Sequence, residues 1–196
     1  MELRVATQDQ ALLAVIELRC RNTNFDTRII EMQFNKFNSS EKIFLRLIHH
    51  PTGSVRAVSD VTDKYVPMIN AITQASLSAA FGKQNRIPVS LNEVEELRIE
   101  INVLSEPMLL SGNYVSRKKE IEIGKHGIIL EYGLHRSVLL PSYAIEKMLD
   151  TTQFLEEAAT SAGLQKDYWK QPKVNIYRFR SQSFVEQSPN GKVEIL

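Results

Sequence analysis

The sequence contains little that would specify a reaction. One cysteine, Cys20, stands among 196 residues, which excludes an internal disulfide framework and a cysteine-based zinc cage. The formal net charge is +1, so no global field would draw the protein onto nucleic acid or an anionic membrane. No stretch reaches the roughly 18 apolar residues of a membrane span, and the first 20 residues lack the apolar core of a signal peptide. These absences predict a cytoplasmic protein.

Sequence motifs of several common sites are also missing. The chain has no phosphate loop, no Gly-x-Gly-x-x-Gly, no His-Glu-x-x-His and no Gly-x-Ser-x-Gly. His49 and His50 are neighbours at the end of an expected strand, so their side chains should point to opposite faces rather than to one metal. We therefore expect no metal and no cofactor, and the sequence names no catalytic residue.

What is present is ordinary globular material, with 43% hydrophobic and 24% charged residues. Helical spacing predicts an amphipathic helix over 8–21 with Cys20 on its apolar stripe, and β-prone runs around Pro51 and Gly53 predict a hairpin. Residues 97–104 alternate as a half-buried strand that ends before Pro107. Other helices are expected over 66–82, ending at Gly82, and over 151–163, with a capping box at Asp150.

The same patterns give the fold class. A final strand is expected over 174–186, and the last ten residues are expected to fray. Helices and strands are interleaved without a regular β-α-β rhythm, which favours an α+β fold of mainly antiparallel strands with packed helices.

The stretch Glu120–Ile129, EIEIGKHGII, predicts two strands that meet at a tight hairpin. Gly124 and Gly127 would supply the positive φ angles of the turn, and Lys125 and His126 are either polar turn residues or members of a site. The basic run around Arg117 is expected to be a solvated turn, with a phosphate contact as the alternative. Tyr177 to Arg180 alternates aromatic and basic residues, which is typical of either a buried strand or a single-strand-binding surface.

The second half of the chain resembles a known family. Residues 120–132, the Leu-Leu-Pro step at 139–141, the helix ending near Gly163 and the final Tyr-Arg-Phe strand resemble the AMMECR-one domain family in the same order. Upstream, IFLRL, RIPVS and LRIEINVLSEP fall where that family has corresponding segments. The resemblance is clearest over residues 43–186 and suggests a divergent archaeal- or bacterial-type member.

The family signature Leu-Arg-Gly-Cys-Ile-Gly corresponds here to Val55–Asp60, and only its arginine, Arg56, is retained. Val58 stands at the cysteine position, and a valine can neither form a thiolate nor bind a metal. The family's Gly-Trp-Asp is also changed, to Met148-Leu149-Asp150. Any chemistry that the cysteine performs in relatives should therefore be absent here.

The resemblance implies one domain over 1–196, built from two unequal, intimately associated subdomains, the larger containing both termini and the smaller inserted into it, with a groove between them. By association only, it also suggests Memo-like or radical-SAM proteins as partners. Membrane and nucleic-acid partners are not expected, and a homo-oligomer is left open.

Three functional hypotheses follow. The leading one is a non-enzymatic or activity-reduced protein that binds a partner or a small anionic ligand in the groove near Arg56. The second is an enzyme of unknown reaction that uses Arg56, Asp60 and His126. The third is single-stranded nucleic-acid binding through residues 177–180. The candidate binding residues are Arg56, Asp60, Arg86, Lys125 and His126.

Overall fold

The computed structural model describes residues 41–62, 66–81, 87–189 and 191–196. The chain divides into two compact units, each taken by itself below. Unit 1 contains the described residues up to Leu104 together with Gln182–Leu196, and unit 2 is Ser105–Ser181. The helix expected over 8–21, the helix stop at Gly82 and the candidate Arg86 all lie outside the described residues.

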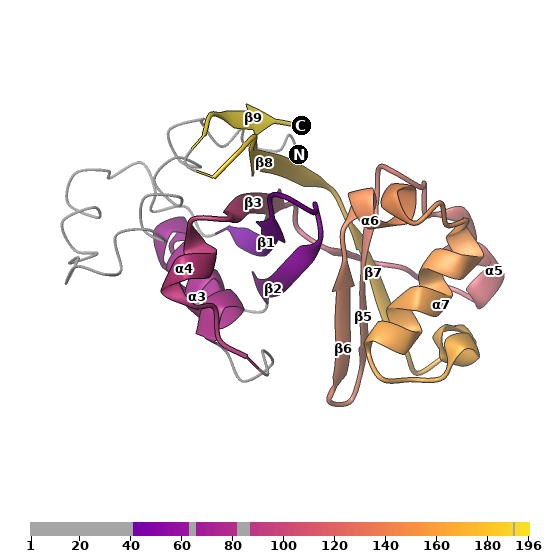
Figure 1. The fold of residues 1–196 in the computed structure, drawn as a ribbon. Helices are drawn as coiled ribbons and strands as arrows, with labels where there is room; N and C mark the ends of the chain where they lie inside the picture. The colour runs from indigo at the N-terminus through magenta and orange to yellow at the C-terminus, as the bar shows by residue number, and fades with distance from the viewer. Residues whose placement is uncertain (1–40, 63–65, 82–86, 190) are drawn as a thin grey trace. The chain divides into compact units, whose positions relative to one another are not determined.

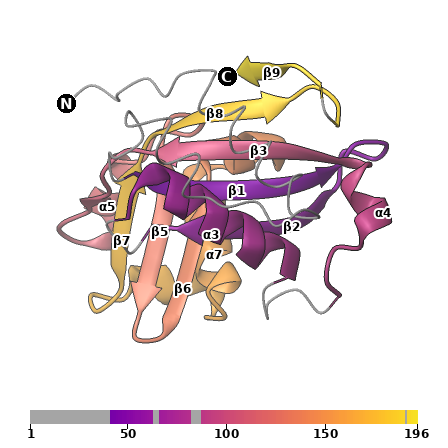
Figure 2. The same ribbon diagram turned by 90° about the vertical axis from the view of Figure 1, so that its left-hand side faces the viewer.

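Unit 1 is a five-stranded sheet with two helices. The strand order is β2-β1-β3-β8-β9, and the pairs β1–β2, β1–β3 and β8–β9 are antiparallel. Figure 2 shows β8, β3, β1 and β2 running side by side, with α3 lying across β1 and β2. The elements are β1 (Lys42–His49), β2 (Val55–Val61), α3 (Met68–Phe81), α4 (Leu91–Val94), β3 (Leu97–Leu104), β8 (Ser181–Glu186) and β9 (Val193–Ile195).

The expected hairpin around Pro51 and Gly53 is confirmed as β1–β2. The His49 N–H donates to the Ser54 carbonyl at 2.9 Å, and the Gly53 N–H donates to the His49 carbonyl at 2.8 Å. Gly53 has φ +68°, a left-handed conformation that glycine adopts without steric cost. The register shifts between Leu47 and Ile48, which places a bulge in β2 at Arg56.

The core of unit 1 lies between the sheet and α3. Ile43, Leu45 and Leu47 point from β1 into this core, and the helix meets them largely with small side chains. Buried alanines let the helix axis approach the sheet closely, as the Ala- and Ser-rich sequence of this segment suggests. They are Ala71, Ala75, Ala79 and Ala80.

The opposite face of the sheet differs from the expectation for β3. Its alternation predicted a half-buried strand, yet Glu100 and Asn102 on the polar side are buried as well as the apolar residues. The prediction was wrong because it assumed that polar residues mark a solvated face. Here their polar atoms have partners in the same sheet, which makes their burial tolerable.

Unit 2 is a four-stranded sheet with helices packed on one face. The strand order is β4-β7-β5-β6. In Figure 1, α6 and α7 lie on one side of β5, β6 and β7, and α5 lies beyond α7. The elements are β4 (Met108–Leu109), α5 (Tyr114–Lys119), β5 (Gly127–Tyr132), β6 (His135–Leu139), α6 (Pro141–Glu146), α7 (Thr151–Ser161), the 3-10 helix η3 (Lys166–Lys170) and β7 (Asn175–Phe179).

Helix α7 contributes four buried residues to the core of unit 2 and begins as expected. Asp150 accepts hydrogen bonds from the Thr152 and Gln153 amides at 2.6 and 2.9 Å, and the Gln153 side chain accepts from the Asp150 amide. Gly163, just beyond the helix, has φ +78°, so the expected glycine stop is also confirmed. Apolar residues of the helix pack against Ile128, Leu130 and Ile176; they are Phe154, Leu155, Ala158 and Ala159.

The expected hairpin over residues 120–129 is absent. Helix α5 occupies Tyr114–Lys119, a turn follows, and only β5, from Gly127 onward, is a strand. The alternation of this stretch arose because Ile121 is buried in the core and Ile123 packs against it from an irregular segment. Gly124 has φ +80°, as expected, whereas Gly127 does not have a positive φ.

The last expected strand is two strands. Residues 175–179 form β7 in the sheet of unit 2, and residues 181–186 form β8 in the sheet of unit 1. Arg180 separates them, and its backbone exchanges hydrogen bonds with Ser105 at 2.8 and 2.9 Å. The chain end does not fray as expected, since β9 pairs with β8.

The α+β fold class with mainly antiparallel strands is confirmed by both sheets. Within the described ranges, the search for a helix of sufficient length and apolar character to cross a membrane finds none.

Candidate functional site

The signature segment forms β2, which is an edge strand of the unit 1 sheet among the described strands. Ala57 and Val61 point into the α3 core, so Val58 and Asp60 lie on the opposite face. Cross-strand pairing places Val58 opposite Arg46 and Asp60 opposite Phe44. Val58, which the sequence resemblance aligns with the family cysteine, is 44% exposed.

A buried polar network lies next to Val58 on this face. Arg46 pairs with both Val58 and Glu100 across the three strands, and its guanidinium lies 3.5 Å from the Glu100 carboxylate. The Asn102 amide donates to the same carboxylate at 2.9 Å, and the Ser183 hydroxyl donates to the Asn102 side-chain oxygen at 2.6 Å. In a low-dielectric environment such linked hydrogen bonds hold their members in one arrangement.

Arg56 is held by residues of its own unit. Its Nε donates to the Glu93 Oε1 at 2.7 Å, and Nη2 donates to Glu93 Oε2 at 3.4 Å and to the Ile87 carbonyl at 3.0 Å. Glu93 also completes a capping box with Ser90 at the start of α4. The Arg56 hydrogen bond and the Ser90 amide lower the pKa of Glu93 to about 2. Arg56 thus fastens residues 87–93 to β2.

Asp60 lies on the same strand but interacts elsewhere. It accepts a hydrogen bond from the Thr62 hydroxyl at 2.6 Å. Four residues along a strand correspond to about 13 Å, and the Arg56 guanidinium is turned to Glu93. The structure therefore gives Arg56 and Asp60 separate hydrogen-bond partners.

Lys125 and His126 belong to unit 2 and both bind Glu122. The Lys125 Nζ lies 2.7 Å from the Glu122 carboxylate, and the His126 Nδ1 accepts from the Glu122 backbone N–H at 3.1 Å. Burial lowers the pKa of His126, and the nearby Arg178 and Arg180 lower it further. Because Nδ1 accepts this backbone N–H, the Nε2 atom is the one that carries a proton, and the imidazole closes the turn before β5.

The candidate residues are therefore distributed over both units. Arg56 and Asp60 lie in unit 1, and Lys125 and His126 lie in unit 2. Their joint use by an enzyme stays a prediction. His49 bonds to Thr52 and Glu96 through its two ring nitrogens. Within the part of the chain that the structure describes, no group of His, Cys, Asp and Glu residues could hold a metal ion.

The strand suspected of nucleic-acid binding is largely internal. Phe179 is buried, as expected for a core strand, and Tyr177 is partly buried. Arg178 donates to the Glu120 carbonyl at 2.6 Å and lies 3.9 Å from the Glu120 carboxylate. A stacking surface needs solvent-exposed aromatic faces, which this strand does not offer.

Sequence reasoning missed the polar residues of the β1 and β3 face. Glu100 and Asn102 were placed on the polar side of a half-buried alternating strand, and Arg46 was not singled out at all. The sequence offered one signal, because a basic residue, Arg46, and an acidic residue, Glu100, occupy paired positions of two strands that are neighbours in the sheet. It also missed Arg117, which lies in α5 and is buried rather than part of a solvated turn.

Comparisons with known proteins agree with these features. The model of the AMMECR1 family matches residues 12–184. A protein of Methanococcus aeolicus is 37% identical over 158 residues, covering 80% of this chain and 79% of its own. Protein MJ0810 of Methanocaldococcus jannaschii is 32% identical over 195 residues, covering 97% of each chain.

A solved structure has the same fold. The crystal structure of the uncharacterized protein PH0010 from Pyrococcus horikoshii is similar, with a TM-score of 0.87 and 25% identity, covering 96% of this chain and 95% of its own. The family match extends through both units and includes residues 55–60. This chain therefore belongs to the AMMECR1 family.

Proposed function

We propose that this protein binds a partner protein or a small ligand through the surface around Val58 and performs no chemistry there. The observation that carries the proposal is an exposed apolar side chain at the signature position, on an edge strand, directly across from the buried Arg46. A valine side chain cannot act as nucleophile, acid, base or metal ligand. It can contribute apolar contact area to an interface.

The surroundings of Val58 suit recognition. Arg46 is held against Glu100, and Asn102 is held by Glu100 and Ser183, so the charges near the surface are fixed in advance. A preorganised polar group beside an exposed apolar residue favours specific binding, because less side-chain freedom is lost when a ligand arrives. Val55, 47% exposed, extends the apolar surface along β2.

Arg56 contributes to this surface in two ways. By binding Glu93 and the Ile87 carbonyl, it fixes the segment that borders β2. Nε and Nη2 make these contacts, and among the described residues Nη1 has no recorded partner. An anionic group of a ligand could therefore bind to Nη1 without displacing Glu93.

We further propose that the protein is cytoplasmic and that one of three kinds of ligand binds to the Val58 surface. A Memo-like or radical-SAM protein is the partner that the family resemblance suggests. A second copy of this chain is the other macromolecular occupant, because an edge strand can pair with its own kind. Dicarboxylates, sugar phosphates and nucleotides represent the small anionic ligands.

Thermal-shift measurements on the full chain test the proposal, with each of these ligand classes and with the two purified candidate partners. We expect at least one to raise the melting temperature of the wild type, and Val58→Asp to abolish that shift. Leu77→Asp is the matched control, because Leu77 is 41% exposed and apolar but lies on α3, beyond the opposite face of the sheet. If the ligand raised the melting temperatures of the wild type and Val58→Asp equally, the Val58 surface would not be the binding site.

A further inference from the structure

Arg117 is a buried cation for which the described residues supply no anionic partner. The residue is 8% exposed and lies in α5. Its Nη1 donates to the Val174 carbonyl at 3.0 Å and to the Gln171 carbonyl at 3.5 Å. No carboxylate among the described residues forms an ion pair with it. Buried charges in proteins are normally paired, so this arrangement calls for an explanation.

The guanidinium atoms of Arg117 that lack hydrogen-bond partners among the described residues lie along one edge, formed by Nε and Nη2. Nε is buried and has no hydrogen-bond partner, and within the described ranges none is recorded for Nη2 either. Nε and Nη2 are the two parallel donors with which arginine grips a carboxylate through both oxygens. The two backbone carbonyls occupy the other nitrogen and hold the guanidinium in place.

A second unsatisfied donor lies in the same corner of unit 2. Trp169 of η3 is 1% exposed, and its indole N–H has no hydrogen-bond partner among the described residues. Arg117 binds the carbonyls of Gln171 and Val174, two and five positions after Trp169 in the chain. Tyr114, one helical turn before Arg117, packs edge-on against the Trp169 ring at 6.1 Å between centroids. In the described part of the chain, two buried N–H donors without acceptors thus lie beside the contact between Tyr114 of α5 and Trp169 of η3.

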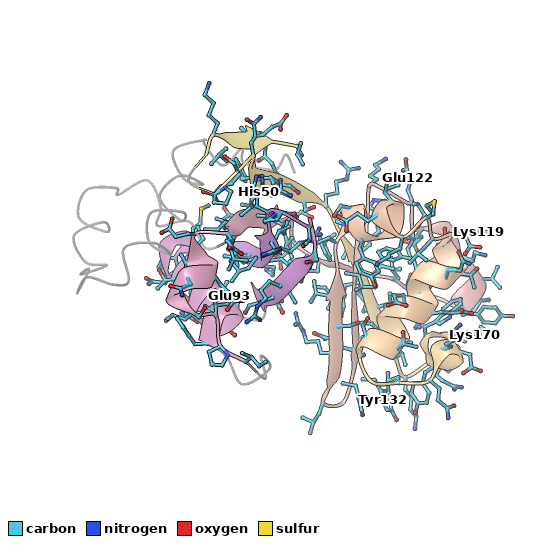
Figure 3. All side chains as sticks on the ribbon, in the orientation of Figure 1. His50, Glu93, Lys119, Glu122, Tyr132 and Lys170 are labelled. Carbon is cyan, nitrogen blue, oxygen red and sulfur yellow. The ribbon has the colours of Figure 1, made fainter. Side chains whose placement is uncertain are left out.

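The surface of this corner is positively charged. Lys118 and Lys119 are exposed at the end of α5, and Lys170 and Lys173 are exposed on the η3 side. Figure 3 labels Lys119 and Lys170, whose side chains are exposed at the surface of unit 2. The Lys170 Nζ lies 5.7 Å from the centre of the Trp169 ring. Such a cluster of cations raises the local concentration of anions in a chain that is nearly neutral overall.

We propose that the corner between α5 and η3 is a carboxylate-binding site, in which the Nε–Nη2 edge of Arg117 and the indole N–H of Trp169 hold the ligand oxygens. Tyr114, 49% exposed, borders the corner through its edge-on contact with the Trp169 ring. The site lies wholly within unit 2 and is independent of the Val58 surface. The carboxylate comes from a small organic acid or from the C-terminus of a peptide, and both present the same group.

Trp169 is the only tryptophan of the chain, so its fluorescence reports on this site alone. The wild type is titrated with sodium acetate at constant ionic strength, with sodium chloride as the balancing salt. We expect a saturable fluorescence change with a dissociation constant on the order of millimolar, as for a ligand of this size. A response that does not saturate, or that chloride reproduces, would overturn the proposal.

Two variants distinguish the contribution of the Arg117 Nε–Nη2 donors from that of the positive charge of the corner. Arg117→Lys keeps the positive charge but lacks the two parallel donors, so acetate should bind at least about tenfold more weakly. Lys119→Gln is the matched control, since it removes an exposed charge of the same corner and should change the affinity by less than about twofold. Equal acetate affinity in Arg117→Lys and the wild type would contradict the assignment. Circular dichroism shows whether each variant is folded.

Ligand analogues test the site without any substitution. Acetamide has the shape of acetate without its charge and should produce no saturable change. A short peptide with a free C-terminus is compared with its amidated form. Binding of the free form alone supports the site and includes peptide termini among its ligands, whereas binding of acetate but neither peptide supports a small organic acid. Equal binding of acetamide and acetate, or of the two peptides, would overturn the proposal.

Discussion

Met148 is the one non-glycine residue of the described chain with a positive φ, +52°. Its side chain is 90% exposed just beyond α6, so it gains little from packing. The left-handed conformation costs a residue with a Cβ about 1–2 kcal/mol, and glycine avoids that cost. The family pattern Gly-Trp-Asp, altered here to begin with Met148, fits this geometry.

Met148→Gly should therefore stabilise the protein. We expect a gain of about 0.5–1 kcal/mol in the free energy of unfolding, because relief of the backbone strain exceeds the added entropy of the unfolded chain. Met148→Ala, which keeps a Cβ, should give no such gain. Urea unfolding of both variants measures the difference in the free energy of unfolding. If Met148→Gly were less stable than Met148→Ala, the backbone at residue 148 would not be strained.

Gly127 is constrained by packing rather than by φ. A Cβ at this position would lie 2.6 Å from the Phe179 Cε2 and 2.7 Å from the Leu139 carbonyl oxygen. Both neighbours are in adjacent strands and the carbonyl belongs to the backbone, so neither can give way easily.

Gly127→Ala should lower the free energy of unfolding by about 2–3 kcal/mol through overpacking. Gly53→Ala serves as the comparison, because a Cβ at Gly53 meets nothing within 4 Å and only its φ of +68° is strained. We expect a loss of about 1 kcal/mol there. Equal losses in the two variants, measured by urea unfolding, would argue against the packing role of Gly127.

At the scale of elements, the ion pair between Arg56 and Glu93 connects β2 to α4. Glu93 is labelled on α4 in Figure 3. Because the pKa of Glu93 falls from 4.5 to about 2 on folding, the carboxylate form stabilises the native state. That contribution is fully present above pH 4.5 and is lost as the pH falls from there to about 2.

Glu93→Gln should therefore lower stability by about 1 kcal/mol at pH 7, a discounted value for a pair that is partly exposed. The difference from the wild type should shrink as the pH falls below about 4.5. Urea unfolding at pH 7, 5 and 3.5 measures this trend, with Glu95→Gln as the exposed neighbouring control. A wild-type advantage that stays constant over this range would show that the carboxylate charge is not the cause.

Elements with a local signal could be predicted from the sequence. The β1–β2 hairpin, the Asp150 capping box and the glycine stop at Gly163 each depend on residues close together in the chain. The absent hairpin before Gly127 and the division at Arg180 depend on distant partners. The apolar residue at position 121 does not mark a strand, because Ile121 packs into the core of unit 2 from an irregular segment. Arg180 separates two strands because Ser105 forms hydrogen bonds with its backbone.

The candidate site was predictable in position but not in role. The resemblance directed attention to residues 55–60, and the structure places Val58 on an exposed edge strand. The resemblance could not predict that Arg56 binds Glu93 or that His126 accepts a hydrogen bond from the Glu122 N–H, because neither hydrogen bond follows from a family motif. Arg117 carried no local signal at all, since its burial depends on residues more than fifty positions away.

For the whole molecule, the two proposals assign separate binding surfaces to separate units. The Val58 surface of unit 1 combines apolar area with a fixed polar network, and the Arg117 corner of unit 2 offers unpaired donors in a basic environment. Because their named residues do not overlap, a substitution at one surface should leave binding at the other unchanged.

The most direct test of the Val58 surface is a map of backbone amide shifts by NMR, a feasible measurement for a 22.4 kDa chain. The protein is titrated with the ligand or partner that gives the largest thermal shift in the panel above, and acetate is titrated separately. The account predicts that the first titration perturbs the amides of Val55–Val61 and of the adjacent Arg46 and Glu100, and that acetate perturbs 114–119 and 166–174. Perturbations by the first ligand that leave Val55–Val61 unchanged would contradict the central claim.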